Sequence, residues 1–179
     1  MILFLNGAFG IGKTTVARAL VARLPGSLLF DPEITGILLQ RSARLLGYRV
    51  EDFQDLRAWR RLTVIGLRLA RLWSANIIVP MAFSNPASLE EIRQAVENFE
   101  PRVYHFCLVA PTEVVQMRLK RRGADPDKQK WEYRRASECC AAHVSDIFAT
   151  HITAVDRTPD ELAETLLFCI RAELNKETA

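Results

Sequence analysis

MILFLNGAFGIGKT, residues 1–14, is the stretch that decides how this chain folds. It opens with a continuous apolar run at residues 1–5, which is typical of a strand buried on both faces of a parallel sheet. Residues 7–14 then match the phosphate-loop pattern G-x-x-x-x-G-K-S/T, and Val16 and Leu20 follow at helical spacing. This order of strand, glycine loop and helix is the context in which the pattern binds a nucleotide.

The loop contains the residue types that a bound phosphate chain requires. Glycines permit backbone conformations that other residues avoid and leave room for phosphate oxygens, and the helix N-terminus adds partial positive charge. Lys13 can reach the β- and γ-phosphates, and the Thr14 hydroxyl can bind Mg²⁺. The predicted nucleotide-binding residues are Gly7, Ala8, Phe9, Gly10, Ile11, Gly12, Lys13, Thr14 and Thr15.

Length and composition indicate one globular domain with a large core, because the chain has 179 residues and 49% of them are hydrophobic. A net charge of +3 is too small to indicate a nucleic-acid partner. The cysteines show no C-x-x-C spacing and the histidines no ligand spacing, so no zinc or redox motif is predicted. No basic leader precedes the apolar start and no stretch reaches transmembrane length, so we expect a cytoplasmic protein.

A short apolar run at residues 28–30 predicts a second strand, which leads into Asp31, Pro32 and Glu33. Carboxylates at the carboxyl end of a parallel strand lie where open α/β sheets bind ligands. Asp31 can hold Mg²⁺ through water or accept the proton of an attacking hydroxyl, and Glu33 can bind a polar group of a substrate. Asp31 also fits the N-cap of a helix at residues 34–46, with Pro32 at its first position. The two roles of Asp31 are compatible.

A long helix is predicted at residues 57–73, with one apolar face turned inward. The residues expected on that inward face are Leu62, Ile65, Leu69 and Leu72. Near the start of the helix, Trp59 and Arg60 can pair a stacking ring with a cation for an anionic or aromatic substrate. Alternatively, Trp59 simply packs in the core.

The third predicted strand, at residues 75–79, is followed by Pro80, Met81, Ala82 and Phe83. Phosphate-loop proteins usually carry a metal-binding aspartate at this position. Its replacement moves the expected Mg²⁺ ligands to Thr14 and Asp31. It also argues against a motor-type ATPase or a regulatory GTPase.

The remaining core elements follow from simple patterns. We expect a helix at residues 88–99 capped by Ser88, and a buried strand at residues 102–109 in which His105 is a hydrogen-bonded core or edge residue. A fifth strand is predicted at residues 151–155. Thr158 and Glu161 form a capping box at the start of the last helix.

Two arginine-rich helices are predicted at residues 112–122 and 130–143. A helical lid at about residues 118–143 would place arginines over the transferring phosphate and exclude water. Arg118 and Arg122 are the leading candidates for this role, followed by Arg134 or Arg135. An ordinary positively charged surface helix is the alternative.

Taken together, these motifs resemble the tunicamycin-resistance ATP-binding proteins, a branch of the small P-loop kinases. The resemblance covers nearly the whole chain. The motifs that carry it are NGAFGIGKT (6–14), FDPE (30–33), DFQ (52–54), WR (59–60), IIVPM (77–81), HF (105–106), RLKRR (118–122) and DIF (146–148).

This resemblance implies an α/β protein with a three-layer α/β/α P-loop kinase fold and a small helical lid. It implies a five-stranded parallel sheet in the order 2-3-1-4-5. It also implies binding of ATP and Mg²⁺, and a ligand like tunicamycin, a lipid-tailed uridine sugar antibiotic.

We therefore predict phosphoryl transfer from ATP to tunicamycin or another nucleoside-like or sugar-like small molecule. The predicted catalytic residues are Lys13, Asp31, Arg118 and Arg122, and the predicted acceptor-binding residues are Glu33, Phe53, Trp59, Arg60 and Met81. One alternative is a protein that sequesters the drug in an ATP-dependent way without changing it. Another is a metabolic kinase of an ordinary nucleoside or sugar acid.

Overall fold

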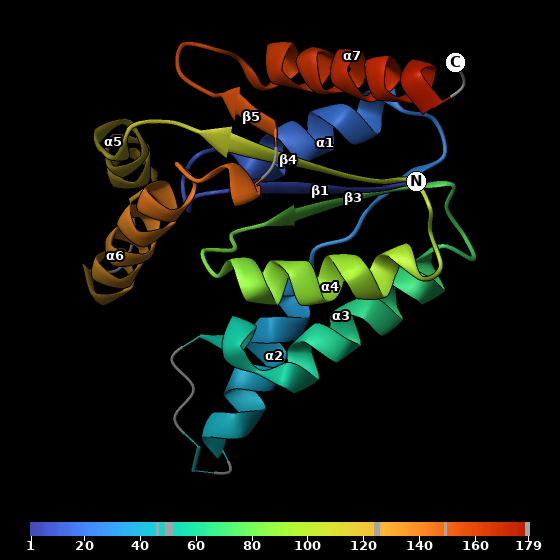
Figure 1. Ribbon diagram of the computed structural model, residues 1–179. Helices are drawn as coiled ribbons and strands as arrows, with labels where there is room; N and C mark the ends of the chain where they lie inside the picture. The colour runs from blue at the N-terminus through green and yellow to red at the C-terminus, as the bar shows by residue number, and fades with distance from the viewer. Residues whose placement is uncertain (46, 49–51, 124–125, 149, 178–179) are drawn as a thin grey trace.

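A single parallel sheet of five strands organises the chain, as the computed structural model shows (Figure 1). The structure describes residues 1–45, 47–48, 52–123, 126–148 and 150–177. The strands lie in the order β2-β3-β1-β4-β5, and their bounds are β1 Ile2–Gly7, β2 Ser27–Leu29, β3 Asn76–Met81, β4 Val103–Val109 and β5 Thr150–Thr153. The predicted fold and strand order are confirmed.

Strand β1 lies at the centre of this sheet and is buried along its whole length. Phe4 pairs with Val79 of β3 on one side and with His105 of β4 on the other. Because both edges and both faces of β1 are covered, every position favours an apolar residue. This explains why the chain begins with an unbroken apolar run.

Helices cover both faces of the sheet and one of its ends (Figure 1). Helices α1 (Lys13–Arg23) and α7 (Pro159–Glu177) lie on one face, and α3 (Arg57–Ala70) and α4 (Pro86–Glu97) lie on the other. Helix α2 (Pro32–Leu45) and the short helix η1 (Phe53–Asp55) extend away beside α3. Helices α5 (Thr112–Arg122) and α6 (Pro126–Ala142) stand at the carboxyl ends of the strands, and η2 (Asp146–Phe148) leads back to β5.

Alternate residues of β1 supply the two halves of the core. Leu3 and Leu5 pack toward α1 and α7, where Leu20 and Leu166 are fully buried. Ile2 and Phe4 pack on the other face, with the residues of α3 and α4. The two-residue period of a strand therefore divides one apolar run between two clusters.

The inward face predicted for the helix at residues 57–73 is wrong. Leu62, Ile65, Leu69 and Leu72 are all exposed, and α3 ends at Ala70. The residues that α3 buries are Trp59, Arg60, Thr63, Leu67 and Ala70. The helix carries two apolar stripes at helical spacing, and only the neighbouring elements decide which stripe is covered.

Helix termini largely follow the predicted caps. The N-cap of α4 is Asn85 rather than Ser88, because the Asn85 side chain accepts hydrogen bonds from the amides of Ala87 and Ser88. The capping box of α7 is confirmed, since the Thr158 amide donates to Glu161 and the Glu161 amide donates back to the Thr158 hydroxyl. Leu46, the predicted end of the second helix, and residues 124–125 of the predicted lid lie outside the described residues.

Among the helices that the structure describes, none combines the length and the apolar character needed to cross a membrane.

Candidate active site

The phosphate loop joins the end of β1 to the start of α1, and its shape depends on two glycines. Gly10 has a φ of 83° and Gly12 a φ of 105°, a region that other L-residues rarely adopt. A Cβ on Gly10 would lie 2.5 Å from Cγ of Leu119. Gly12 is also the N-cap of α1, and its backbone carbonyl accepts from Val16. The first amides of α1 therefore remain available to a phosphate.

The other loop residues contribute in two different ways. Ala8 and Ile11 bury their side chains in the core and so anchor the loop. Lys13 is buried and Thr14 is half-buried, and both line a cavity in front of the loop. Thr15 is exposed in the first turn of α1.

This cavity has a volume of about 590 Å³, within the range of small-molecule sites. It opens at the carboxyl ends of the strands, between the loop, α2 and α6. Among the described residues, it is lined by Phe9, Gly10, Gly12, Lys13, Thr14, Glu33, Ile37, Gln40, Phe53, Arg122, Trp131, Glu132 and Arg134.

Glu33 and Lys13 meet in this cavity. Nζ of Lys13 lies 4.0 Å from Oε1 of Glu33 and 5.0 Å from the centre of the Phe9 ring. The Glu33 Oε1 is buried and has no hydrogen-bond partner among the described residues. Burial raises the pKa of Glu33, and the nearby Lys13 only partly opposes this rise. A carboxylate with these properties is suited to accept a proton.

Asp31 caps α2, as one of its two predicted roles requires. Its Oδ1 accepts a hydrogen bond of 3.0 Å from the amide of Glu33. Asp31 is not among the residues that line the cavity, whereas Glu33 is. The first turn of α2 therefore directs Glu33, rather than Asp31, toward Lys13.

Of the other predicted acceptor residues, the structure brings only Phe53 to the cavity. Trp59 is buried in the core, and its Nε1 donates to the backbone oxygen of Pro32 at 2.9 Å. Arg60 points to α4, where its Nε lies 2.6 Å from Oε2 of Glu91. Met81 packs in the core cluster beneath α3 and α4. The structure therefore agrees with the alternative in which Trp59 packs in the core.

Trp131 of α6 and two residues of α2, Ile37 and Gln40, line the cavity but were not predicted to do so. The ring centres of Trp131 and Phe9 lie 5.2 Å apart in an edge-to-face arrangement. The only sequence signal for Trp131 is an aromatic residue inside the predicted lid. For Ile37 and Gln40 the sequence offers no signal, because their positions depend on the angle at which α2 leaves the sheet.

The arginines of α5 and α6 divide into two groups. Arg122 and Arg134 line the cavity. Arg118 instead donates to the backbone oxygens of Ile11 and Ala154, both at 2.8 Å, and so ties the phosphate loop to the end of β5. Arg135 forms an ion pair of 2.7 Å with Asp52, which links α6 to the segment before η1.

The residues present fit a magnesium ion held together with phosphate oxygens. Mg²⁺ is usually bound by one or two carboxylates plus the phosphates of its substrate, and Thr14 and Glu33 line the same cavity. The unpartnered Oε1 of Glu33 is a suitable ligand atom. In the described part of the chain no cluster of three or more histidine, cysteine or acidic side chains would hold a metal by itself.

A buried polar network supports the loop from behind. The Asn6 side chain accepts from the Phe83 amide at 2.9 Å and donates to the Phe83 oxygen at 3.2 Å. Nε2 of His143 lies 2.6 Å from the same oxygen, which requires the tautomer that carries a proton on Nε2. These contacts hold the end of β1, the segment after β3 and the end of α6 together.

His105 does not have the hydrogen bond that the sequence analysis expected. It is buried, and neither ring nitrogen has a partner among the described residues. Burial lowers the pKa of His105 to about 3, with Arg93 and His143 adding to the effect. Burial likewise lowers the pKa of His143 to about 4.

We expect the protein to lose stability as the pH falls below about 6.5. The unfolded histidines bind protons near that pH, whereas the folded His105 and His143 stay neutral down to about 3 and about 4. The unfolded state therefore binds more protons, and each histidine costs up to about 1.4 kcal/mol per pH unit. Urea unfolding at several pH values between about 7.5 and about 5, above the range in which most carboxylates titrate, measures the slope.

His105→Phe is expected to flatten this pH dependence by about half. Glu33 acts in the opposite direction, because its raised pKa favours the folded state as the pH falls. The test therefore compares the pH slope of the unfolding free energy in the variant with that in the wild type. An unchanged slope in His105→Phe would show that the acid sensitivity arises elsewhere.

Comparison with known proteins agrees with this geometry. A family model described as an AAA domain matches residues 2–138. The fold is similar to the structure of the Deinococcus radiodurans tunicamycin resistance protein, with a TM-score of 0.74, 28% identity and coverage of 97% of this chain and 95% of that one. No significant match is found among curated proteins.

Two kinases share the fold at lower identity. A gluconokinase from Sinorhizobium meliloti 1021 aligns with a TM-score of 0.68, 17% identity and coverage of 98% of this chain and 94% of that one. A shikimate kinase from Acinetobacter baumannii, solved in complex with shikimate, aligns with a TM-score of 0.60, 17% identity and coverage of 96% and 93%. Because the AAA domain model covers most of the chain, from β1 into α6, the protein belongs to that family, with a P-loop kinase-like fold.

Proposed function

We propose that this protein is an ATP-dependent phosphotransferase that acts on a hydroxyl group of a small molecule. The observation that carries the proposal is the approach of Lys13 to the half-buried carboxylate of Glu33 in one cavity of about 590 Å³. The buried Oε1 of this carboxylate has no hydrogen-bond partner among the described residues. A nucleotide-binding loop alone needs no such carboxylate. A kinase needs one to take the proton of the attacking hydroxyl.

The chain's own residues account for each part of the transfer. The loop amides and Lys13 hold the phosphates and offset their charge. Thr14 and one of the two carboxylates, Asp31 or Glu33, would hold Mg²⁺, which would screen that charge further, and the other carboxylate stays free to accept a proton. The acceptor oxygen forms a bond to the γ-phosphorus, the bond from that phosphorus to the β–γ bridging oxygen breaks, and ADP leaves. The proton passes to Glu33, or to Asp31 if the substrate reorients the start of α2. Arg122 and Arg134 stabilise the charge on the transferring group.

For the acceptor, we propose tunicamycin or a related nucleoside-like or sugar-like compound. The support is the likeness to the tunicamycin resistance protein over 97% of this chain. Phosphorylation of the drug would then confer resistance. Ile37, Phe53 and Trp131 give the cavity an apolar side. This side is suited to contact a ring or an alkyl chain of the acceptor next to its reacting hydroxyl.

A second candidate is a protein that sequesters the drug in an ATP-dependent way without modifying it. It is favoured by the end of β3 and the residues after it, where Met81, Ala82 and Phe83 are buried in place of a metal-binding aspartate. It is also favoured by Arg118, which is engaged with backbone oxygens.

Incubation with γ-labelled ATP and tunicamycin separates these candidates. Transfer of label to the drug supports the phosphotransferase. Recovery of intact drug and ATP from a complex that forms only with ATP supports sequestration. A parallel thermal-shift screen of nucleosides, sugars and sugar acids tests for a metabolic kinase, because a true substrate stabilises the folded protein. No transfer to any of these acceptors would contradict the proposal.

A matched pair of variants identifies the proton acceptor. Glu33→Gln is expected to lower kcat about 10²-fold or more, because the group that takes the proton is lost. Asp31→Asn keeps an N-cap and is expected to change kcat less than about tenfold. Steady-state kinetics across pH provide the measurement. Because the pKa of Glu33 is raised, we expect the acidic limb of the pH–rate profile to lie above the pH range in which glutamates usually titrate. Equal losses in both variants would exclude Glu33 as the single base.

A further inference from the structure

A second, smaller hollow adjoins the active-site cavity on the side of η1. It has a volume of about 160 Å³ and lies between η1, the segment before α4 and α6. It shares Trp131 and Arg134 with the active-site cavity, and none of its described lining residues comes from the phosphate loop. The hollow therefore extends the part of the site that is left for an acceptor, rather than the part that holds phosphates.

An ion pair forms one wall of this hollow. Nη2 of Arg135 lies 2.7 Å from Oδ2 of Asp52, and the two side chains are only 12% and 15% exposed. Nη1 of Arg135 lies 2.5 Å from Oε2 of Glu138, which is more exposed. The third nitrogen of Arg135, Nε, is buried and has no hydrogen-bond partner among the described residues. Carboxylates of the chain itself therefore occupy both terminal nitrogens of a largely buried cation.

The backbone holds Asp52 in this position. Its Oδ1 accepts a hydrogen bond of 2.9 Å from the amide of Gln54, as the N-cap of η1. The Gln54 side chain in turn donates to the backbone oxygen of Ala82 at 3.2 Å. Because Oδ1 is fixed in this way, Oδ2 faces Arg135. The pair is part of the folded framework and differs from a contact between two mobile side chains at the surface.

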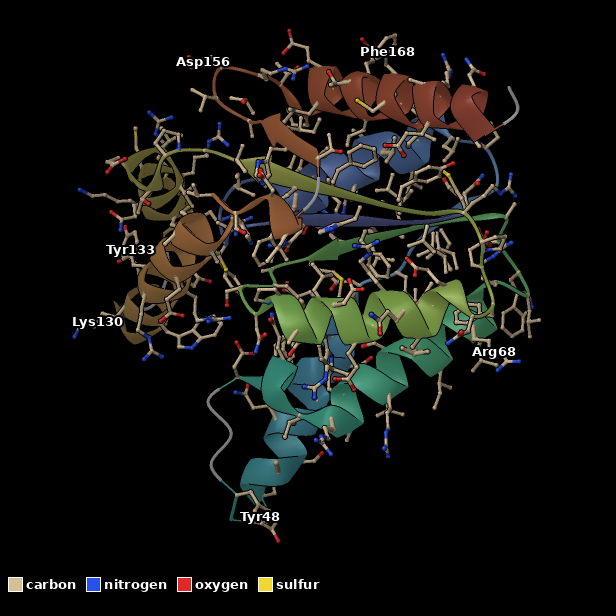
Figure 2. The ribbon with its side chains drawn as sticks, viewed as in Figure 1. Tyr48, Arg68, Lys130, Tyr133, Asp156 and Phe168 are labelled. Atoms are coloured by element: carbon tan, nitrogen blue, oxygen red, sulfur yellow. The ribbon has the colours of Figure 1, made fainter. Side chains whose placement is uncertain are left out.

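Other cations on this side of the site are engaged elsewhere or lie outside it. Arg60 is buried and points to α4, where its Nε lies 2.6 Å from Oε2 of Glu91, and its Nη1 donates to the backbone oxygen of Gln54 at 2.8 Å. Lys130 is exposed and lies at the outer surface of α6 (Figure 2). The formal charges in the described lining of the hollow cancel, because it contains two arginines and two carboxylates: Arg134, Arg135, Asp52 and Glu138.

A carboxylate on an acceptor would find the best cation of this hollow already occupied. Proteins bind carboxylates most specifically with an arginine whose parallel N–H groups face the two carboxylate oxygens. At Arg135, Asp52 takes that place, so an acidic acceptor would be repelled by Asp52 and left without a partner. An unpaired charge in a largely buried site is costly. A repulsive group of this kind is one way in which a site rejects one class of ligand.

We propose that Asp52 is a specificity-determining residue that restricts the acceptor to molecules without a carboxylate. By neutralising Arg135, it favours uncharged sugars and nucleosides over sugar acids. This role rests on the phosphotransferase function proposed above, because it concerns the acceptor side of the same site. It decides which molecule binds, however, and binding can be measured without transfer.

Binding of matched acceptors to the whole chain tests this role. Two pairs of compounds differ in a carboxylate: uridine with orotidine, a uridine that carries a carboxylate on its base, and glucose with glucuronate. Isothermal titration in the presence of Mg²⁺ and a non-hydrolysable ATP analogue measures affinity apart from chemistry. We expect the wild-type protein to bind neither acid more tightly than its neutral partner.

Asp52→Asn should raise the affinity for at least one of the two acids about tenfold or more, because it removes the competing carboxylate from Arg135. Affinity for the neutral partners should change by less than about threefold. Asparagine can still accept a hydrogen bond from the Gln54 amide, so the start of η1 is retained. The double variant Asp52→Asn, Arg135→Gln should lose the gain, because the cation that binds the acid is gone.

Glu91→Gln is the matched control. It also removes a carboxylate from a buried arginine, but that arginine, Arg60, is not among the residues that line the cavity or the hollow. It should bind both pairs of compounds like wild type. Circular dichroism and thermal melting check that each variant is folded.

Several results would overturn the role of Asp52. A wild-type protein that binds an acid more tightly than its neutral partner would do so without any variant. An Asp52→Asn variant with no gain for either acid would also overturn it, as would a gain that the double variant keeps or that Glu91→Gln equals. Absence of label transfer from γ-labelled ATP to any acceptor would count against the phosphotransferase and not against this selectivity, which is measured by binding.

Discussion

Lys13→Met is expected to lower the rate of phosphoryl transfer about 10²–10³-fold while leaving the fold intact. The Lys13 ammonium lies at the start of α1, in the cavity and against the Phe9 ring and Glu33. It is placed to offset the charge that develops on the transferring group, and such an interaction is strongest in the transition state. Methionine keeps most of the apolar stem, so packing around the buried side chain is largely retained.

Single-turnover kinetics with γ-labelled ATP measure this effect apart from ATP binding. Lys120→Met is the matched control, because Lys120 is exposed on α5 and lies outside the cavity. It should behave like wild type. If Lys13→Met retained the wild-type rate, the lysine would not act on the transferring phosphate.

Trp59→Ala is expected to lower the free energy of unfolding by about 3–5 kcal/mol. The Trp59 side chain is 1% exposed and packs edge-to-face against Phe53 at 5.1 Å and against Phe83 at 5.7 Å. Its removal leaves a cavity and also deprives the Pro32 oxygen of its donor. Because Pro32 precedes Glu33 and Phe53 lines the active site, we expect weaker substrate binding as well.

Urea denaturation followed by circular dichroism measures the change. Trp59→Phe separates the two contributions, since it fills much of the space but leaves the Pro32 oxygen without its indole donor, at a cost of about 1–3 kcal/mol. Trp73→Ala is the control for loss of a tryptophan at the surface and should change stability by less than about 0.5 kcal/mol. A loss in Trp59→Ala no larger than that of the control would contradict the packing role.

Local sequence was sufficient for the elements that depend on local chemistry. The phosphate loop needs glycines at Gly10 and Gly12 because their φ angles are positive. The pattern specifies Gly12, and Gly10 occupies one of its variable positions. The Asp31 cap and the Thr158 capping box likewise involve neighbours in the chain. The buried strand β1 is visible in the sequence as an unbroken apolar run. The strand order was available because the motifs resembled a family, not because spacing defines it.

Long-range packing decided what the sequence left open. Helix α3 has two apolar stripes, and the one with Trp59 and Leu67 is buried because it meets η1, α4 and the sheet. The sequence wrongly predicts that the exposed stripe, with Leu62, Ile65 and Leu69, is core, because periodicity shows that a face is apolar but not what covers it. The sequence predicts a hydrogen-bonded His105, yet neither of its ring nitrogens has a hydrogen-bond partner among the described residues.

By itself, the sequence determined that the chain builds a phosphate-binding loop between a buried strand and a helix, and that a carboxylate pair follows the second strand. Only the tertiary structure decided which carboxylate faces Lys13, that Trp131 and Arg134 share its cavity, and that Arg118 holds the loop to the end of β5. The reason is physical. A loop or a cap is formed by residues a few positions apart, whereas the cavity joins side chains more than a hundred residues apart, whose distances depend on how the helices pack on the sheet.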